Sequence, residues 1–175
     1  PTFFGNTVRL TFDMDVPDAY AGEGYVGLNT GSCCNESGIF VGLTGTGWNL
    51  DLQGLAGGQN MFITESEGIA SAGTTLGVSV QVDITDTGGT IGFGEIKVDL
   101  FNEGTTTSLP GTSQYVYNLN APQRALLPTL DNVAMGFAGA TGINEIDNIV
   151  VDQGPPFGIP GIPEPTSLAL AVMGL

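Results

Sequence analysis

The sequence predicts an all-β fold, an antiparallel sandwich of two sheets with jelly-roll topology, followed by an extended proline-rich tail. Three observations predict this fold. Apolar residues recur at every second position in many short runs, those runs are bounded by glycine, proline or asparagine, and helical periodicity with caps is scarce. The composition agrees, because the 175 residues include 28 glycines and only 12% are charged.

The clearest strands lie in the first part of the chain. Residues 8–15, VRLTFDMD, alternate apolar and polar side chains and predict a half-buried strand. Residues 77–85 repeat the pattern, and the DTGG sequence at 86–89 provides a turn into a further run at 91–101. We therefore expect the second and third of these runs to pair as a β-hairpin.

Shorter runs predict the remaining strands. They are bounded by turn-forming residues and comprise 25–28, 38–44, 48–53, 61–65, 114–119, 132–137 and 144–152. Residues 121–131 have room for a single helical turn between their prolines. About ten short strands at this spacing are typical of a two-sheet sandwich or jelly roll.

The composition divides the chain into three parts. We expect the sandwich to occupy residues 1–152, a stem rich in proline and glycine to occupy 153–162, and an apolar segment to occupy 163–175. An extended apolar segment becomes ordered only by packing on something. We therefore expect the tail to dock on its own sandwich or on a neighbouring subunit. Because the sequence begins at Pro1 rather than Met, we also expect that an upstream segment such as a signal peptide has been removed.

The charge balance excludes whole classes of function. The chain has eighteen Asp and Glu residues but only three Lys and Arg, which gives a net charge of −15. This charge opposes binding to a phosphate backbone, so we expect no nucleic-acid partner. The sequence contains no His. Nucleophilic sites that use histidine as the base, and histidine-based zinc or copper sites, therefore cannot be built within this chain.

The two cysteines of the chain are neighbours, Cys33 and Cys34. Adjacent cysteines can join each other only through a strained ring. The pair is thus a candidate for a disulfide to another chain, and free thiols or a local vicinal bridge are the alternatives.

A sorting motif is present near the end of the sequence. Pro163, Glu164 and Pro165 precede an apolar run at 168–175, and this arrangement resembles the PEP-CTERM sorting signal. The resemblance implies export to the cell surface or extracellular matrix of a Gram-negative bacterium, with processing by a sorting enzyme of the exosortase type. The apolar run departs from the signal, because it has eight residues where a spanning helix needs about 20, and no basic cluster follows it.

A second resemblance covers residues 75–152. A GF-x-x-x-TG turn followed by an Ile-Asp-Asn triplet resembles the closing half of a concanavalin A-like, laminin-G-like sandwich. The residues that carry it are Gly136, Phe137, Thr141, Gly142, Ile146, Asp147 and Asn148. That family includes lectins, adhesion modules and some glycosidases, so the resemblance implies a fold more than an activity.

The hydrolase signature of this family is incomplete here. Glu145 and Asp147 match two acids of its Glu-x-Asp-x-x-Glu strand motif, but Val150 stands where the third acid belongs. Strand alternation alone would put Glu145 and Asp147 on one face at about 7 Å. Without a predicted cleft or a raised carboxyl pKa, we expect no enzyme and no catalytic residue.

Carboxylates supply a candidate calcium site. Calcium accepts flexible cages of oxygen ligands, and the candidates are Asp13, Asp15, Asp18, Asp147 and Asp152. Solvated surface carboxylates are the alternative. No cofactor other than this calcium ion is expected.

Aromatic residues supply a candidate sugar platform. Tyr115 and Tyr117 share one strand face and, with Trp48, could stack on a carbohydrate ring. Packing in the core is the alternative.

Together these features favour an exported, non-enzymatic structural protein of the cell surface or biofilm matrix. We expect it to self-assemble, and a head-to-tail contact would build a filament. The alternative is a carbohydrate-binding module that retains exopolysaccharide.

Overall fold

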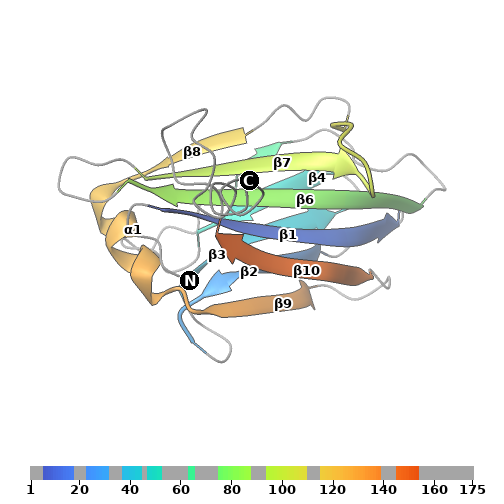
Figure 1. Cartoon of the computed structure of the whole chain (residues 1–175). Helices are drawn as coiled ribbons and strands as arrows, with labels where there is room; N and C mark the ends of the chain where they lie inside the picture. Colours follow the sequence, from blue (N-terminus) through green and yellow to red (C-terminus); the bar gives the residue numbers. More distant parts are fainter. Residues whose placement is uncertain are drawn as a thin grey trace, which may run out of the picture.

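Two five-stranded sheets form a β-sandwich in the computed structural model (Figure 1). The structure describes residues 6–17, 23–31, 37–44, 47–52, 63–65, 75–87, 94–109, 115–138 and 145–153. Sheet A has the order β10 (Ile146–Gln153), β1 (Asn6–Pro17), β6 (Thr75–Asp86), β7 (Gly94–Asn102) and β8 (Tyr115–Leu119). Sheet B has the order β5 (Ile63–Glu65), β4 (Gly47–Asp51), β3 (Gly38–Thr44), β2 (Glu23–Asn29) and β9 (Asn132–Ala138).

The all-β, two-sheet prediction is confirmed, and every predicted run contains a strand. The predicted hairpin is confirmed as well, because β6 and β7 pair antiparallel from Val78–Asn102 to Asp86–Gly94. The stem and sorting segment from Gly154 onward lie outside the described residues.

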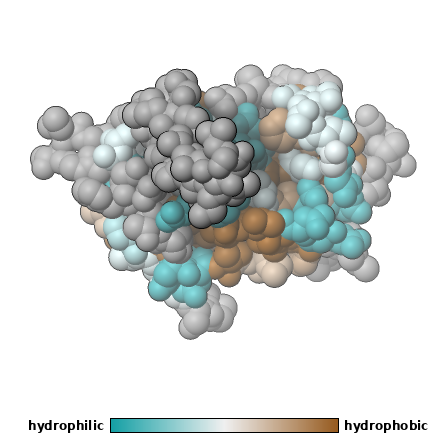
Figure 2. Space-filling view, viewed as in Figure 1, coloured by the Kyte–Doolittle hydropathy of each residue, from teal (hydrophilic) through white to brown (hydrophobic). Residues whose placement is uncertain are grey.

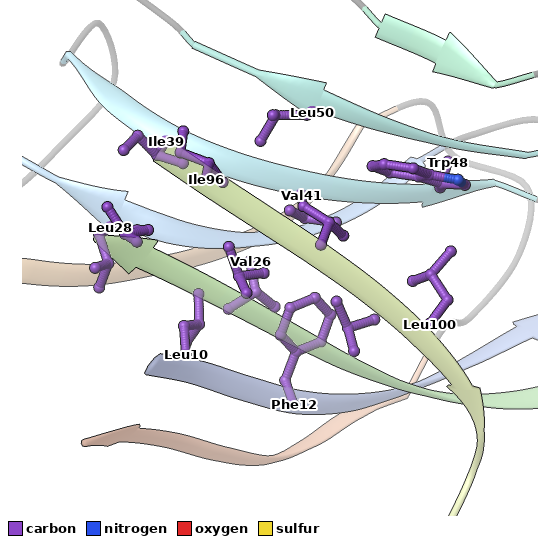
Figure 3. Close-up of a cluster of buried hydrophobic side chains, with 14 of the residues drawn as sticks. Leu10, Phe12, Val26, Leu28, Ile39, Val41, Trp48, Leu50, Ile96 and Leu100 are labelled. Carbon is purple, nitrogen blue, oxygen red and sulfur yellow. The ribbon is translucent and has the colours of Figure 1, made fainter. Parts of the chain in front are cut away.

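The core fills the space between the two sheets, as Figure 3 shows. In β1 every second side chain points inward, and Leu10, Phe12 and Met14 are each 1% exposed. Directly opposed residues of paired antiparallel strands share a face, so Val82 and Val80 of β6 continue the same inner layer. Burying such side chains supplies most of the driving force for folding.

A short helix connects the two sheets at one end of the sandwich (Figure 1). α1 (Ala121–Leu126) and the 3₁₀ turn η1 (Leu127–Thr129) join β8 to β9. Asn120 and Gln123 cap the helix reciprocally, each side chain bonding the other's backbone N–H at 2.9 Å. The same end of the sandwich also carries the ion pair of Arg124 with Asp86, at 2.6 Å.

Candidate functional site

An acidic pocket lies at the other end of sheet A. β1 and β10 bring its members together, because Asp13 opposes Asp147 in register and the N–H of Asp15 donates to the carbonyl of Glu145 at 3.0 Å. Glu103, just beyond β7, completes the group. The pocket encloses about 120 Å³ and is lined by Met14, Asp15, Glu103, Glu145 and Asp147.

A bulge in β10 shapes this end of the sheet. The register passes from Asp13–Asp147 to Thr11–Val150, so Asn148 and Ile149 share the space opposite one residue of β1. Asn148 has φ +50°, a left-handed conformation that asparagine adopts more readily than most residues. Simple alternation along the strand therefore fails at this point.

Asp13 ties three strands together at this bulge. One carboxylate oxygen accepts from Ser79 Oγ at 2.5 Å and the other accepts from Asn148 Nδ2 at 2.8 Å. Ser79 Oγ in turn accepts from the N–H of Gly104 at 3.2 Å. Asp13 is a predicted calcium ligand, but in the structure its carboxylate joins β1, β6 and β10 through these hydrogen bonds.

No basic side chain neutralises the acidic pocket. The three basic residues of the chain all form ion pairs elsewhere, Arg9 with Asp83, Lys97 with Glu95, and Arg124 with Asp86. Desolvation of the Glu103 carboxyl, and then the negative charges of Asp15, Asp13, Asp147 and Glu145, raise its pKa above the ordinary value. The pocket therefore favours cations and protons over anions.

The structure brings together part of the predicted calcium set. Asp15 and Asp147 line the pocket, but Asp152 lies opposite Arg9, farther along β10 toward its end. Asp18 lies outside the described residues. Within the described part of the chain, no three carboxylates are arranged to hold one metal ion. Glu145 and Asp147, the two acids that match the incomplete hydrolase motif, both line the same pocket.

The predicted aromatic platform lies mostly inside the sandwich. Trp48 is 3% exposed, and its ring contacts Tyr115 edge to face at a centroid distance of 5.5 Å. The hydroxyl of Tyr117 accepts from Gln123 Nε2 at 3.2 Å. These rings therefore pack against the core, and Trp48 offers no open face for a sugar to stack on.

Sequence reasoning missed a groove on the outer face of sheet A. It encloses about 420 Å³ and combines the ring of Phe101 with polar side chains, among them Thr11, Gln81, Thr105 and Asn148. Its residues come from four separate segments, so no local motif marks it. The only signal was the alternation that turns Thr11 and Gln81 outward.

The exposed edge strand β9 is the second feature that the sequence did not reveal. Val133, Met135 and Phe137 are 45%, 59% and 54% exposed. Figure 2 shows a hydrophobic area at the lower centre of this view, in the region where β10 and β9 lie in Figure 1.

Some predicted features lie outside the described residues. They are the sorting motif Pro163, Glu164 and Pro165 and the cysteine pair Cys33 and Cys34. No helix in the described ranges is both long and apolar enough to cross a membrane.

No protein-family model, curated protein or solved structure matches this chain.

Proposed function

We propose that this chain is an exported, non-enzymatic structural protein that self-associates through the edge strand β9. The observation that carries the proposal is an uncharged, apolar edge. The seven residues of β9, NVAMGFA, include no charge and no proline, and their described apolar side chains reach 59% exposure at Met135. An edge of this kind is a template for pairing with another chain.

The other edge strands in the described residues are poorer templates. β5 has only three residues. β10 carries the bulge at Asn148 together with Asp147 and Asp152. β8 has five residues, and two of its side chains, Tyr115 and Tyr117, pack against the core. Short length, bulges and charge are the devices that protect sheet edges, and β9 has none of them.

Sequence features support the location and the fold type in this proposal. The sorting-signal resemblance supports export to the surface or matrix of a Gram-negative bacterium and handling by an exosortase-type enzyme. The resemblance of residues 75–152 supports a concanavalin A-like jelly roll. A net charge of −15 opposes close approach of two copies, and β9, which has no charged residue, adds nothing to that repulsion.

Sedimentation velocity and electron microscopy test this function. We expect association to rise with concentration, and Met135→Lys to raise the concentration needed by about tenfold, which corresponds to about 1.4 kcal/mol. Val116→Lys is the matched control, because Val116 is an exposed valine on the edge strand β8. Equal effects of the two changes, or no association at any concentration, would reject the proposal.

The groove on the outer face of sheet A favours a second function, carbohydrate binding. Phe101 provides an apolar ring, and Gln81 and Asn148 provide amides beside it. Phe101→Ala should then abolish retention on a glycan array and Val116→Lys should leave it unchanged. Absence of binding across neutral and acidic glycans would reject carbohydrate binding and favour the structural function.

A further inference from the structure

β9 presents a core-facing surface that is left open. Val133 and Met135 oppose Leu28 and Val26 of β2, and opposed residues share a face of the sheet. Leu28 and Val26 are 1% and 0% exposed, whereas Val133 and Met135 are 45% and 59% exposed. The inner layer of sheet B therefore continues into β9 without the cover that it has at β2.

The backbone of β9 is open along the same side. β9 pairs with β2, and the described residues provide no strand on its other side. Its outer N–H and C=O groups can accept one further extended segment by strand addition. A segment placed there would satisfy the backbone and cover the apolar side chains together.

We propose that residues 166–175 of the same chain lie along β9 as an extended segment and so regulate self-association. This inference rests on the proposed function, because the covered edge is the surface through which copies associate. Copies then associate only when the segment is displaced.

The chemistry of this segment fits the edge. TSLALAVMGL carries no charge, and the last charged residue before it is Glu164. In an extended conformation Leu168, Leu170 and Val172 share one face, with the spacing of Val133, Met135 and Phe137 on β9. Binding of a second copy at β9 would instead bring together two chains that each have a net charge of −15.

The connection is long enough. β10 ends at Gln153, at the end of the sandwich where β9 begins (Figure 1). The proline-rich residues 154–165 span up to about 37 Å at about 3.1 Å per residue, and a seven-residue strand spans about 24 Å. The chain can therefore pass along β9 and return antiparallel to it. Attachment also gives this segment a higher local concentration than the segment of another copy.

Oxidation of Met135 by dilute peroxide, followed by mass spectrometry, tests the inference in the full chain. Met14 is 1% exposed and serves as the protected internal reference. At concentrations where the protein is monomeric, we expect Met135 to oxidise at least about fivefold more slowly than in Leu168→Asp/Leu170→Asp, because a covered side chain reacts only after local opening. Ala169→Asp/Ala171→Asp adds the same charge on the opposite face and should keep the protection. The Leu168→Asp/Leu170→Asp variant should also associate at lower concentration.

Two outcomes overturn the inference. Met135 that oxidises equally fast in the unchanged chain and in the Leu168→Asp/Leu170→Asp variant shows that the segment does not cover β9. Protection that grows with protein concentration shows that another copy covers it. In both cases concentration-dependent association that Met135→Lys weakens would still support the proposed function, so the two failures are distinguishable.

Discussion

At the scale of single residues, the pKa of Glu103 depends on the groups around its carboxyl. Its side chain lies over Gly77, where an added Cβ would meet the Glu103 carboxylate. Desolvation raises its pKa most, and the negative charges of four other acids raise it further. A raised carboxyl pKa favours the protonated form in the folded state, so the ionised group destabilises the fold above that pKa.

Glu103→Gln should therefore raise the melting temperature near neutral pH. The Glu103 carboxyl binds a proton more tightly in the folded state than in the unfolded state. Its ionised form therefore destabilises the fold fully above the folded pKa, and this destabilisation disappears below the unfolded pKa of about 4.3. The gain should shrink as the pH falls toward that value, which thermal unfolding monitored by circular dichroism at several pH values can measure. Asp131→Asn is the control, because Asp131 lies outside this pocket. A gain that is independent of pH would contradict the explanation.

The ion pair of Arg124 with Asp86 is the best shielded one in the described residues. The two side chains are 12% and 9% exposed, and they connect α1 to the end of β6. Removal of one partner from a largely buried pair leaves an uncompensated charge behind.

Arg124→Met should lower the free energy of unfolding by about 3 kcal/mol. Urea denaturation measures this value. Lys97→Met is the matched control, because the Lys97 side chain is 31% exposed in its pair with Glu95, and we expect less than about 1 kcal/mol there. Similar losses in both variants would show that burial does not decide the strength of these pairs.

At the scale of elements, sheet B depends on glycines that let its strands and rings pack closely. Phe40 lies against Gly27 and Gly38, and Tyr25 lies against Gly136. The rings of Phe40 and Tyr25 meet edge to face at 5.9 Å. A Cβ on Gly27 would come within 2.2 Å of the Ile39 carbonyl oxygen, and a backbone atom in a paired strand cannot easily move.

Gly27→Ala should cost about 3 kcal/mol of unfolding free energy, the upper part of the usual range for overpacking. Gly104→Asn is the control, since Gly104 has open space around it and φ +67°, a conformation that asparagine tolerates. Denaturation midpoints of the two variants compare them directly. If Gly27→Ala were as stable as Gly104→Asn, the close approach at Gly27 would not constrain the sheet.

At the scale of the whole molecule, a chain of 175 residues has a net charge of −15 and only three basic side chains. Self-repulsion of like charges opposes the compact state, and salt screens it over a Debye length of about 10 Å at 0.1 M. Salt would weaken the three ion pairs, but the chain carries eighteen acidic residues against three basic ones, so repulsion among the acids dominates.

Sodium chloride should therefore raise the melting temperature as its concentration increases from about 0.02 to about 0.5 M. Differential scanning calorimetry measures the change, and sucrose at equal osmolality controls for effects other than screening. A melting temperature that falls with salt would show that the ion pairs outweigh the general repulsion.

The sequence by itself determined where the strands lie and which side chains of β1 and β6 form the core. Alternation of apolar and polar residues is a local property of the strand, so VRLTFDMD already specified its inner face. Only the tertiary structure decided that Asp15, Glu103 and Asp147 gather in one pocket and that β9 lies open at an edge. Those outcomes depend on pairing between distant segments and on the bulge at Asn148, which resets the alternation of β10.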